Sequence, residues 1–299
     1  MNSKERRPTL LQHCVAGIVA GGFSTAVLYP LDLVKVRYQV HEQSPRAYKS
    51  LLHAFTSLVK GPGASAWHWR AMYQGMSPAL YGTTMSWGLY FYFYEQAKTM
   101  YATSSLPPSI GHFLSGIQAG VMCVPLTNPI WLIKVRMQVQ GTAVPYKNVA
   151  DAFKRIIAEE GVRALYKGAV PALFLTSHGA FKFVAYEKLK SEYTSYVSRD
   201  MSIPASLTIG ALSQAFASTA TYPYQVIKAR LQQGGPVADK YTGTWDCTKR
   251  IIKYEGMPGL YKGLTPNLIK VLPNGALIFA VYEYVSKLLM QSSDSNVSV

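Results

Sequence analysis

The chain has 299 residues, of which 49% are hydrophobic and only 15% are charged, well below the quarter that is usual in soluble domains. Thirty lysines and arginines stand against fifteen acidic residues, and this net charge of +15 points to nucleic acid, anionic lipid or an anionic substrate. Mean hydropathy is only +0.06, low for helices surrounded by lipid, and predicts an apolar exterior around a polar, water-filled interior.

Several function classes are excluded by what the sequence lacks. Cys14, Cys123 and Cys247 have no CxxC spacing, so we expect neither a disulfide framework nor a zinc site. The motifs GxGxxG, GxxxxGK(S/T), HExxH and GxSxG are absent, so we expect no catalytic residues, no metal site and no enzyme. Basic residues are spread along the chain rather than clustered, which argues against a nucleic-acid partner.

The N-terminal residues 1–13 are polar and too short for a transit peptide, and they lack the apolar core of a signal peptide, so organellar targeting would be internal. An apolar helix is predicted at 10–40, a short amphipathic helix at 48–60 and a second apolar helix at 78–100. A membrane-spanning helix needs about 20 residues, and both apolar stretches are that long.

The same order of elements then recurs twice. Long apolar helices are predicted at 110–140 and 204–233, short amphipathic ones at 147–160 and 241–255, and second apolar helices at 171–192 and 266–290. Each repeat has Pro near the end of its first long helix, followed by Lys, Arg and Gln at the same spacing: Pro30, Lys35, Arg37 and Gln39; Pro129, Lys134, Arg136 and Gln138; Pro223, Lys228, Arg230 and Gln232. Because proline breaks the helical hydrogen-bond ladder, we expect each of these helices to bend inward.

A further signal supports the threefold repeat. A segment ending in glycine closes each short helix region, at Gly75, Gly168 and Gly263, although the first copy carries an unusual insertion at 61–75. We therefore predict repeats at 8–101, 107–195 and 203–291. Small residues spaced as GxxxG, at Gly17 and Gly21 and again at Gly116 and Gly120, predict close helix packing.

The triplicated Pro-x-acid-x-x-base motif, followed by aromatic–base–glycine, resembles the mitochondrial carrier family over about residues 10–290. The resemblance implies an all-α membrane protein with six transmembrane helices in three pseudo-threefold repeats, short matrix-side helices, and both termini toward the intermembrane space. It also implies alternating access to a central site. The segments SWGLYF, TNPIW, TSHGA and TYPYQV, which begin at Ser86, Thr127, Thr176 and Thr221, resemble the folate and FAD carrier branch. Carriers of NAD and pyrimidine nucleotides are related to that branch.

The resemblance implies a matrix gate in which the acid in the first long helix of each repeat pairs with the base in the first long helix of the next repeat. Asp32 would pair with Lys134, whereas Gln225, which stands where an acid is expected, can only hydrogen-bond Lys35. One ion pair would thus remain of three, and the matrix side would open at lower energy. Glutamines that resemble the family's braces lie below these contacts: Gln39, Gln138 and Gln232.

Trp131 replaces the acid of the second motif, so it cannot form an ion pair with Lys228. Either its ring packs against lipid or core, or it stacks on a flat ligand. The resemblance implies a second gate on the cytoplasmic side. Its residues would be Glu95 with Lys98, Glu187 with Lys190, and Glu283 without a matching base.

The expected substrate site lies midway along the second long helix of each repeat. The resemblance places Gly82, Leu175 and Lys270 at the level that faces the cavity, with Lys270 as the cation and Gly82 leaving space for a bulky group. His178 and Lys182, four residues apart, share one helix face. Each has an alternative, because His178 could be a hydrogen-bonded link between helices and Lys182 could extend toward the membrane surface.

Thr176 is a further candidate for substrate binding, although its hydroxyl could instead bond the preceding turn. We therefore expect a mitochondrial inner-membrane transporter of a flat anionic cofactor, FAD or folate, which is its substrate and not a resident cofactor. The alternatives are a carrier of NAD or pyrimidine nucleotides and a non-transporting membrane adaptor. Expected partners are the anionic substrate and anionic lipid such as cardiolipin, with no nucleic acid, and the chain is expected to be a monomer.

Overall fold

The structure is a computed structural model that describes residues 10–41, 51–60, 69–103, 107–140, 146–197, 201–234 and 241–295. All regular elements in these ranges are helices, which confirms the predicted all-α fold. The predicted boundary at residue 8 and most of the insertion at 61–75 lie outside the described residues. The remaining repeat boundaries stay predictions.

The six predicted long helices all form. Five of them are continuous: α1 (Leu10–Val40), α3 (Met76–Ala102), α4 (Pro108–Val139), α8 (Ile203–Gln232) and α11 (Leu264–Ser295). The short amphipathic helices form as α2 (Leu51–Lys60), α5 (Val149–Glu160) and α10 (Thr244–Glu255). A turn of 3-10 helix follows each one: η1 (Trp69–Tyr73), η2 (Val162–Tyr166) and η4 (Met257–Tyr261). Pro30, Pro129 and Pro223 lie inside continuous helices.

The sixth long helix, predicted as one element at 171–192, is divided. It runs as α6 (Ala169–Phe174), a 3-10 turn η3 (Leu175–Ser177) and α7 (His178–Tyr196). The hydroxyls of Thr176 and Ser177 donate to carbonyls three residues back, each at 2.7 Å. Hydroxyl groups that bond the preceding turn compete with the regular ladder, which accounts for the tighter turn at this point.

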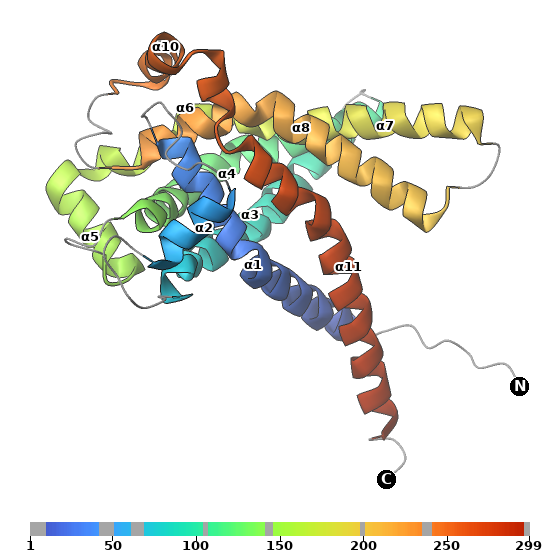
Figure 1. Cartoon of the computed structure of the whole chain (residues 1–299). Helices are drawn as coiled ribbons and strands as arrows, with labels where there is room; N and C mark the ends of the chain where they lie inside the picture. The colour runs from blue at the N-terminus through green and yellow to red at the C-terminus, as the bar shows by residue number, and fades with distance from the viewer. Residues whose placement is uncertain are drawn as a thin grey trace, which may run out of the picture.

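The long helices pack as three pairs, α1 with α11, α3 with α4, and α7 with α8 (Figure 1). Helices α1, α4 and α8 also contact one another. These contacts lie at the end of the bundle that holds the proline motifs, residues 29–39, 128–138 and 222–232, which we call the motif end. Away from it the α7–α8 pair diverges from the α1–α11 pair (Figure 1). We call this the splayed end.

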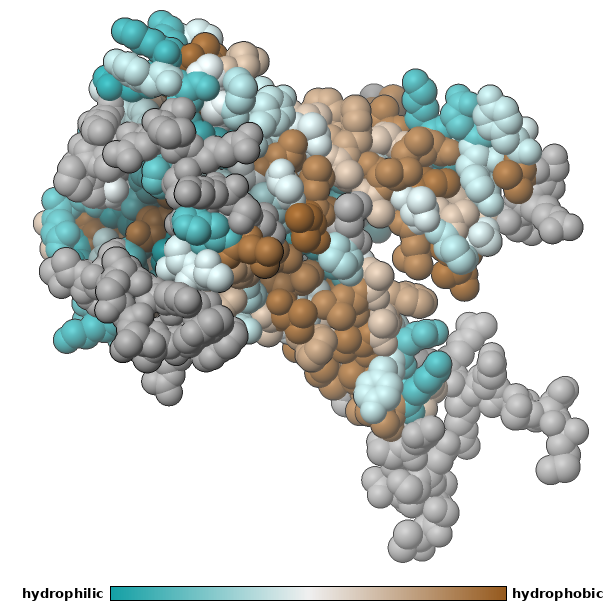
Figure 2. All heavy atoms as spheres, viewed as in Figure 1, coloured by the Kyte–Doolittle hydropathy of each residue, from teal (hydrophilic) through white to brown (hydrophobic). Residues whose placement is uncertain are grey.

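Three described helical segments are long and apolar enough to cross a membrane: Val15–Val40, Ile110–Val139 and Met257–Met290. Figure 2 shows hydrophobic side chains covering the diverging helix pairs, while hydrophilic ones gather around the motif end and at the tips. Large apolar side chains such as Ile18, Phe23 and Val27 are exposed there. The apolar exterior expected from composition is therefore present.

The tightly packed core lies at the motif end, where each short helix packs on the first long helix of its own repeat. Ile156 of α5 packs with Leu132 and Ile133 of α4, and Ile251 of α10 packs with Val226 of α8. Leu33, Val34 and Ala54 make the smaller equivalent cluster in the first repeat. This packing holds the three motifs beside one another.

Of the two predicted GxxxG pairs, only the second lies at a close helix contact. A Cβ on Gly116 would lie 3.3 Å from the Tyr90 hydroxyl, and one on Gly120 would lie 3.1 Å from Cγ2 of Thr176. Among the described residues, no atom would lie within 4 Å of a Cβ on Gly17 or Gly21, so the prediction for α1 is wrong. That face of α1 lies on the exposed side of its helix pair.

Candidate substrate cavity and gate

The three motifs are joined by one contact that repeats around the bundle. The arginine seven residues after each proline donates its Nε–H to the carbonyl of the motif glutamine in the following repeat. The distances are 3.1 Å from Arg37 to Gln138, 3.3 Å from Arg136 to Gln232 and 3.0 Å from Arg230 to Gln39. A closed ring of this kind positions all three motifs together.

The closing glycines make a second ring. Gly75, Gly168 and Gly263 have φ of 78°, 81° and 84°, a left-handed conformation that side chains rarely adopt. A Cβ on each would meet the carbonyl oxygen of a motif lysine of the next repeat, at 3.1 Å from Lys134, 3.2 Å from Lys228 and 2.9 Å from Lys35. Glycine is therefore required both by the backbone and by this close approach.

The predicted braces also link neighbouring repeats. The side-chain amide of Gln138 donates to the Tyr29 hydroxyl at 3.1 Å and to the Asp32 carboxylate at 3.2 Å. Gln39 donates to the Tyr222 hydroxyl at 3.2 Å, and Gln232 donates to the Asn128 side-chain oxygen at 3.1 Å. All three glutamines are buried, so these bonds are shielded from water.

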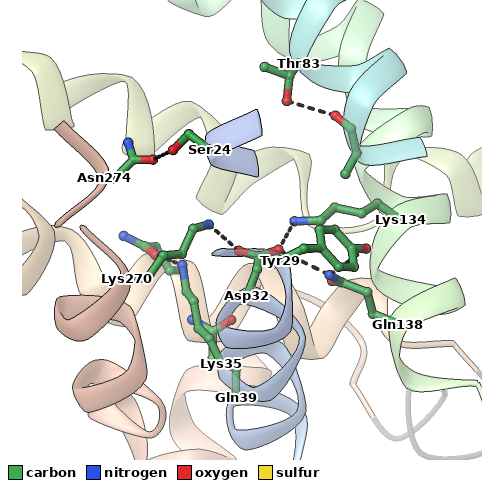
Figure 3. Close-up of polar contacts among 12 residues, drawn as sticks. Ser24, Tyr29, Asp32, Lys35, Gln39, Thr83, Lys134, Gln138, Lys270 and Asn274 are labelled. Carbon is green, nitrogen blue, oxygen red and sulfur yellow. Dashed lines mark hydrogen bonds and ion pairs between the residues drawn. The ribbon is translucent and has the colours of Figure 1, made fainter. Parts of the chain in front are cut away.

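Above the braces lie the residues of the expected matrix gate. Lys134 contacts Asp32 at 2.6 Å, and Lys35 donates to the side-chain oxygen of Gln225 at 2.9 Å, the two contacts that the family resemblance implies. Asp32 is 6% exposed, and Figure 3 shows it between lysines from different helices. The ion pair is therefore largely withdrawn from solvent, where removing one partner is costly.

Trp131 does contact Lys228, through its ring rather than through a carboxylate. The Lys228 ammonium lies 5.8 Å from the ring centroid, and that of Lys134 lies 5.4 Å from it. Both distances suit a cation–π interaction, worth about 0.5–2 kcal/mol. The indole N–H donates to Ser86 of α3 at 3.2 Å, which orients the ring. The aromatic side chain thus takes the place of an acid between two bases.

Lys270, expected to contact substrate, reaches the gate instead. Its ammonium lies 2.6 Å from Asp32 (Figure 3), so this one carboxylate bridges Lys134 and Lys270. The side chain of Lys270 remains 30% exposed, and a competing anion can reach it. The sequence offered no signal for this contact, because the two residues lie at opposite ends of the chain.

A cavity of about 380 Å³ lies among the gate residues, and its volume is within the usual range of ligand pockets. Many expected residues line it: Asp32, Lys35, Gln39, Trp131, Lys134, Leu175, His178, Gln225, Lys228 and Gln232. Residues that sequence reasoning missed also line it: Gln214, Ser218 and Asn267. Asp32 is the one carboxylate among the described lining residues. The cavity wall is thus predominantly basic.

His178 is a hydrogen-bonded link between α7 and α8, the alternative raised above. Its Nδ1 lies 3.0 Å from the Thr221 hydroxyl, which itself donates to the carbonyl of Ala217 and must therefore accept from the ring. The other ring nitrogen, Nε2, lies 3.0 Å from the amide nitrogen of Gln214 and accepts from it. These partners fit the neutral tautomer with hydrogen on Nδ1.

Three other candidates lie away from the cavity lining. Gly82 does not leave space for a ligand, since Trp131 and Ile130 fill it, with Ile130 Cγ2 3.2 Å from a Cβ placed there. The Thr176 hydroxyl bonds Leu173, as the helix-turn alternative predicted, and its methyl packs on Gly120. Lys182 is exposed.

The expected cytoplasmic-side gate is not assembled at the splayed end. Lys98 lies 3.3 Å from Glu95, but this pair is within one helix and is exposed. Glu187, Lys190 and Glu283 are exposed as well. Among the residues that the structure describes, none of these five forms an ion pair with another repeat. In this conformation the bundle is held at one end only.

Two acidic residues at the rim of the motif end were missed by sequence reasoning, although the glycine-closed segments contain them. Arg136 and Lys167 both bind Glu160, and Arg230 and Lys262 both bind Glu255. Burial alone would raise the pKa of each carboxyl, but the hydrogen bonds from its two bases outweigh burial and hold the pKa below its usual value. These clusters fasten α5 and α10 to the bundle.

A helical bundle with an apolar exterior, a basic cavity and a gate of threefold-related contacts defines a membrane carrier of anionic solutes. The profile of the family described as mitochondrial carrier protein matches residues 6–105, 106–197 and 199–293. The chain therefore belongs to the mitochondrial carrier family, in the folate and FAD carrier branch.

Curated relatives match over nearly the full chain. "Folate transporter 1, chloroplastic" of Arabidopsis thaliana is 40% identical, covering 94% of this chain and 96% of the relative. "Nicotinamide adenine dinucleotide transporter 1, chloroplastic" of the same plant is 34% identical, covering 97% and 95%. A mitochondrial FAD carrier of Saccharomyces cerevisiae is 32% identical, covering 92% and 96%. Named relatives thus carry cofactors that contain ring systems and anionic groups.

Proposed function

We propose that this protein transports a flat anionic cofactor, FAD or folate, across the mitochondrial inner membrane by alternating access. The observation that carries the proposal is the cavity at the closed motif end. Lys35, Lys134 and Lys228 line it, and Lys270 reaches Asp32, the one carboxylate among the described lining residues. Four bases against one acid attract an anion into a site of low dielectric.

The flat part of the substrate has a surface to bind as well. Trp131 lines the same cavity, and its ring is already oriented by the bond to Ser86. An aromatic pair in stacked or edge contact contributes about 0.5–1.5 kcal/mol beyond its area burial. A pteridine or isoalloxazine ring would displace or share the lysine contacts on this face. Thus ring and anionic tail can be recognised by adjacent groups.

Transport then requires the motif end to open while the splayed end closes. Opening separates Asp32 from Lys134, breaks the bond between Lys35 and Gln225 and withdraws Lys228 from Trp131. Only the first of these contacts joins two charged groups. The end facing the matrix would therefore open more readily than one with three buried ion pairs. Closure of the splayed end would bring Glu95, Glu187 and their basic neighbours into contact.

Carriage of NAD or pyrimidine nucleotides is the second candidate. The relatives that are named for NAD match as broadly as those named for folate, and the same cavity would accept a diphosphate. A non-transporting adaptor is disfavoured, because an adaptor has no use for a gate of separable contacts around a charged cavity. The compartment is also part of the proposal, since relatives of both organelles match. We also propose that the protein is a monomer and that its motif-end surface contacts cardiolipin.

Uptake by proteoliposomes tests the function. Purified protein would be assayed with FAD, tetrahydrofolate, NAD and pyrimidine nucleotides, each with and without a counter-substrate inside. We expect saturable uptake of FAD or folate. Absence of uptake and exchange for every compound would contradict transport, and uptake of NAD or a pyrimidine nucleotide alone would favour the second candidate.

Lys270→Ala provides the site test. Because Lys270 is 30% exposed and holds Asp32, which lines the cavity, an entering anion would compete for it, and we expect uptake to fall to the background rate. Its thermal transition should stay close to that of the parent protein, because Asp32 keeps Lys134 at 2.6 Å and Gln138 at 3.2 Å. Lys188→Ala, on an exposed position of α7, is the matched control and should transport normally. Normal uptake by Lys270→Ala would remove this residue from the site.

A further inference from the structure

Two lysines of the gate lack the carboxylate that the third one has. In the first motif the residue two places after proline is Asp32, which holds Lys134 and Lys270 at 2.6 Å each. Trp131 and Gln225 occupy the equivalent places in the other two motifs. Lys228 consequently contacts the Trp131 ring, and Lys35 donates to the neutral side-chain amide of Gln225. Among the described residues, neither lysine forms an ion pair.

These two lysines share a cavity wall with an unused hydrogen-bond donor. Asn267, on α11, lines the same cavity and is 4% exposed. Its side-chain nitrogen has no hydrogen-bond partner among the described residues. A buried donor without a partner costs about 1–3 kcal/mol, so such a group usually marks a missing acceptor. The amide donor and both cations would be satisfied by the same acceptor.

Lys35, Lys228 and Asn267 come from three different helices, α1, α8 and α11, and all three line the cavity. We call this group the floor site. Asp32 does not serve it, since its carboxylate is already shared by Lys134, Lys270 and Gln138. The floor therefore combines two cations and one N–H donor and offers no acid of its own.

We propose that the floor site binds the anionic group of the substrate, which supplies the negative charge that positions 131 and 225 lack. The proposal deepens the proposed function and rests on it for the identity of the natural ligand. The chemistry recognised is a compact group with several anionic oxygens. A diphosphate and a pair of carboxylates both fit, because ammonium and amide N–H groups donate to phosphate and carboxylate oxygens alike.

This assignment differs from the expectation that Lys182 and Lys270 hold the anion. Lys182 is exposed and outside the cavity lining, and Lys270 is engaged by Asp32. The contacts of Lys35 with Gln225 and of Lys228 with Trp131 are with uncharged groups, and neither lysine has a carboxylate partner among the described residues. An anion gains more binding free energy from a cation that is not already paired with a carboxylate, because no existing ion pair has to be broken.

The test uses the purified full chain and two probes, inorganic pyrophosphate and glutarate, with binding measured by calorimetry and by the thermal transition. At about five times its Kd, a bound probe should raise the transition by about 2–4 °C. A response to pyrophosphate alone would identify a diphosphate site, and a response to glutarate alone a dicarboxylate site. If neither probe binds, the floor site is not an anion site.

Gln225→Glu gives the sharpest variant, because it places a carboxylate beside Lys35, as Asp32 stands beside Lys134. We expect the unliganded protein to melt at or above the parent temperature, while probe affinity falls tenfold or more. Trp131→Asp should act in the same way on Lys228. Lys228→Gln should also weaken the probe, and Lys188→Gln, on the outer surface, should leave it unchanged.

The proposal is overturned if Gln225→Glu and Trp131→Asp bind the probe as tightly as the parent protein does. It is also overturned if Lys188→Gln weakens the probe as much as Lys228→Gln does, since binding would then follow net charge. Probe binding is measured without transport. A protein that binds the probe at the floor but takes up no cofactor would refute the proposed function and leave this site standing.

Discussion

The two ends of the bundle hold charged residues of the same types in very different surroundings. At the motif end the side chain of Asp32 is 9% exposed and lies 2.6 Å from two lysines of other helices. At the splayed end the side chain of Glu95 is 61% exposed and lies 3.3 Å from a lysine of its own helix. Burial and partner choice, rather than charge content, therefore decide which end is closed.

This difference is what an alternating carrier requires. A pathway that opens at one end at a time needs two gates, of which one is assembled in each state. Here the contacts at the motif end join all three repeats, whereas the residues expected to gate the splayed end remain apart. The following predictions ask how much of the closure depends on each end, beginning with the largest effect.

Asp32→Asn should have the largest effect. It keeps the shape of the side chain but leaves Lys134 and Lys270 without their shared carboxylate in a largely buried site. Removing one partner of a buried ion pair costs about 3–5 kcal/mol, so we expect a fall of that size in the free energy of unfolding. Thermal unfolding in lipid nanodiscs measures it. An Asp32→Asn protein that melts with the parent would show that the gate pair does not hold the motif end.

Gly168→Ala should have an intermediate effect. Its φ of 81° is unfavourable for alanine, and the added Cβ would lie 2.9 Å from Cγ of Gln232. A side chain in this backbone region costs roughly 1–3 kcal/mol, and the brace must also shift. We expect both lower stability and faster labelling of a cysteine introduced in the cavity from the motif-end side.

Gly17→Ala is the matched control at the splayed end. In the described part of the chain, no atom lies within 4 Å of a Cβ placed on Gly17, and alanine favours helix over glycine by up to about 1 kcal/mol. Stability should therefore be unchanged or slightly higher. A comparable loss in both variants would mean that packing at the two ends is equally tight, contrary to the structure.

Glu95→Gln should have the smallest effect. An exposed pair within one helix contributes about 0.2–1 kcal/mol, so the thermal transition should scarcely move. Transport is the informative readout, because Glu95 would gain partners only when the splayed end closes. Normal uptake together with a normal transition would show that this residue belongs to a solvated helix end and not to a gate.

Much of the fold could be predicted because the same pattern of residue types recurs in three segments, so each repeat supports the helix boundaries predicted for the other two. The long helices and the short helices follow from local pattern and repeat spacing, whereas the contacts of Asp32 with Lys134 and of Gln225 with Lys35 were implied by the family resemblance. The division at 175–177 did not follow, because a hydroxyl that bonds the preceding turn is also compatible with a regular helix, and residue type alone does not show which form the backbone takes.

The candidate site was harder to predict than the fold. Gly82 was expected to leave room for a ligand. The space beside a glycine can instead be filled by a side chain of the neighbouring helix, and here Trp131 of α4 fills it. Asn267 gave no signal at all in the sequence. Its importance depends on being buried beside a cavity with an unused donor, which no local pattern records.

The sequence by itself determined the threefold repeat, the apolar helices, the excess of basic residues and the loss of two motif acids, because each is a matter of residue type and spacing along the chain. Only the tertiary structure decided that Lys270 shares Asp32 with Lys134, that Trp131 lies between two lysines, and that Lys35, Lys228 and Asn267 line one cavity. Side chains from different helices have no fixed relation until packing at the motif end sets the rotation and depth of each helix.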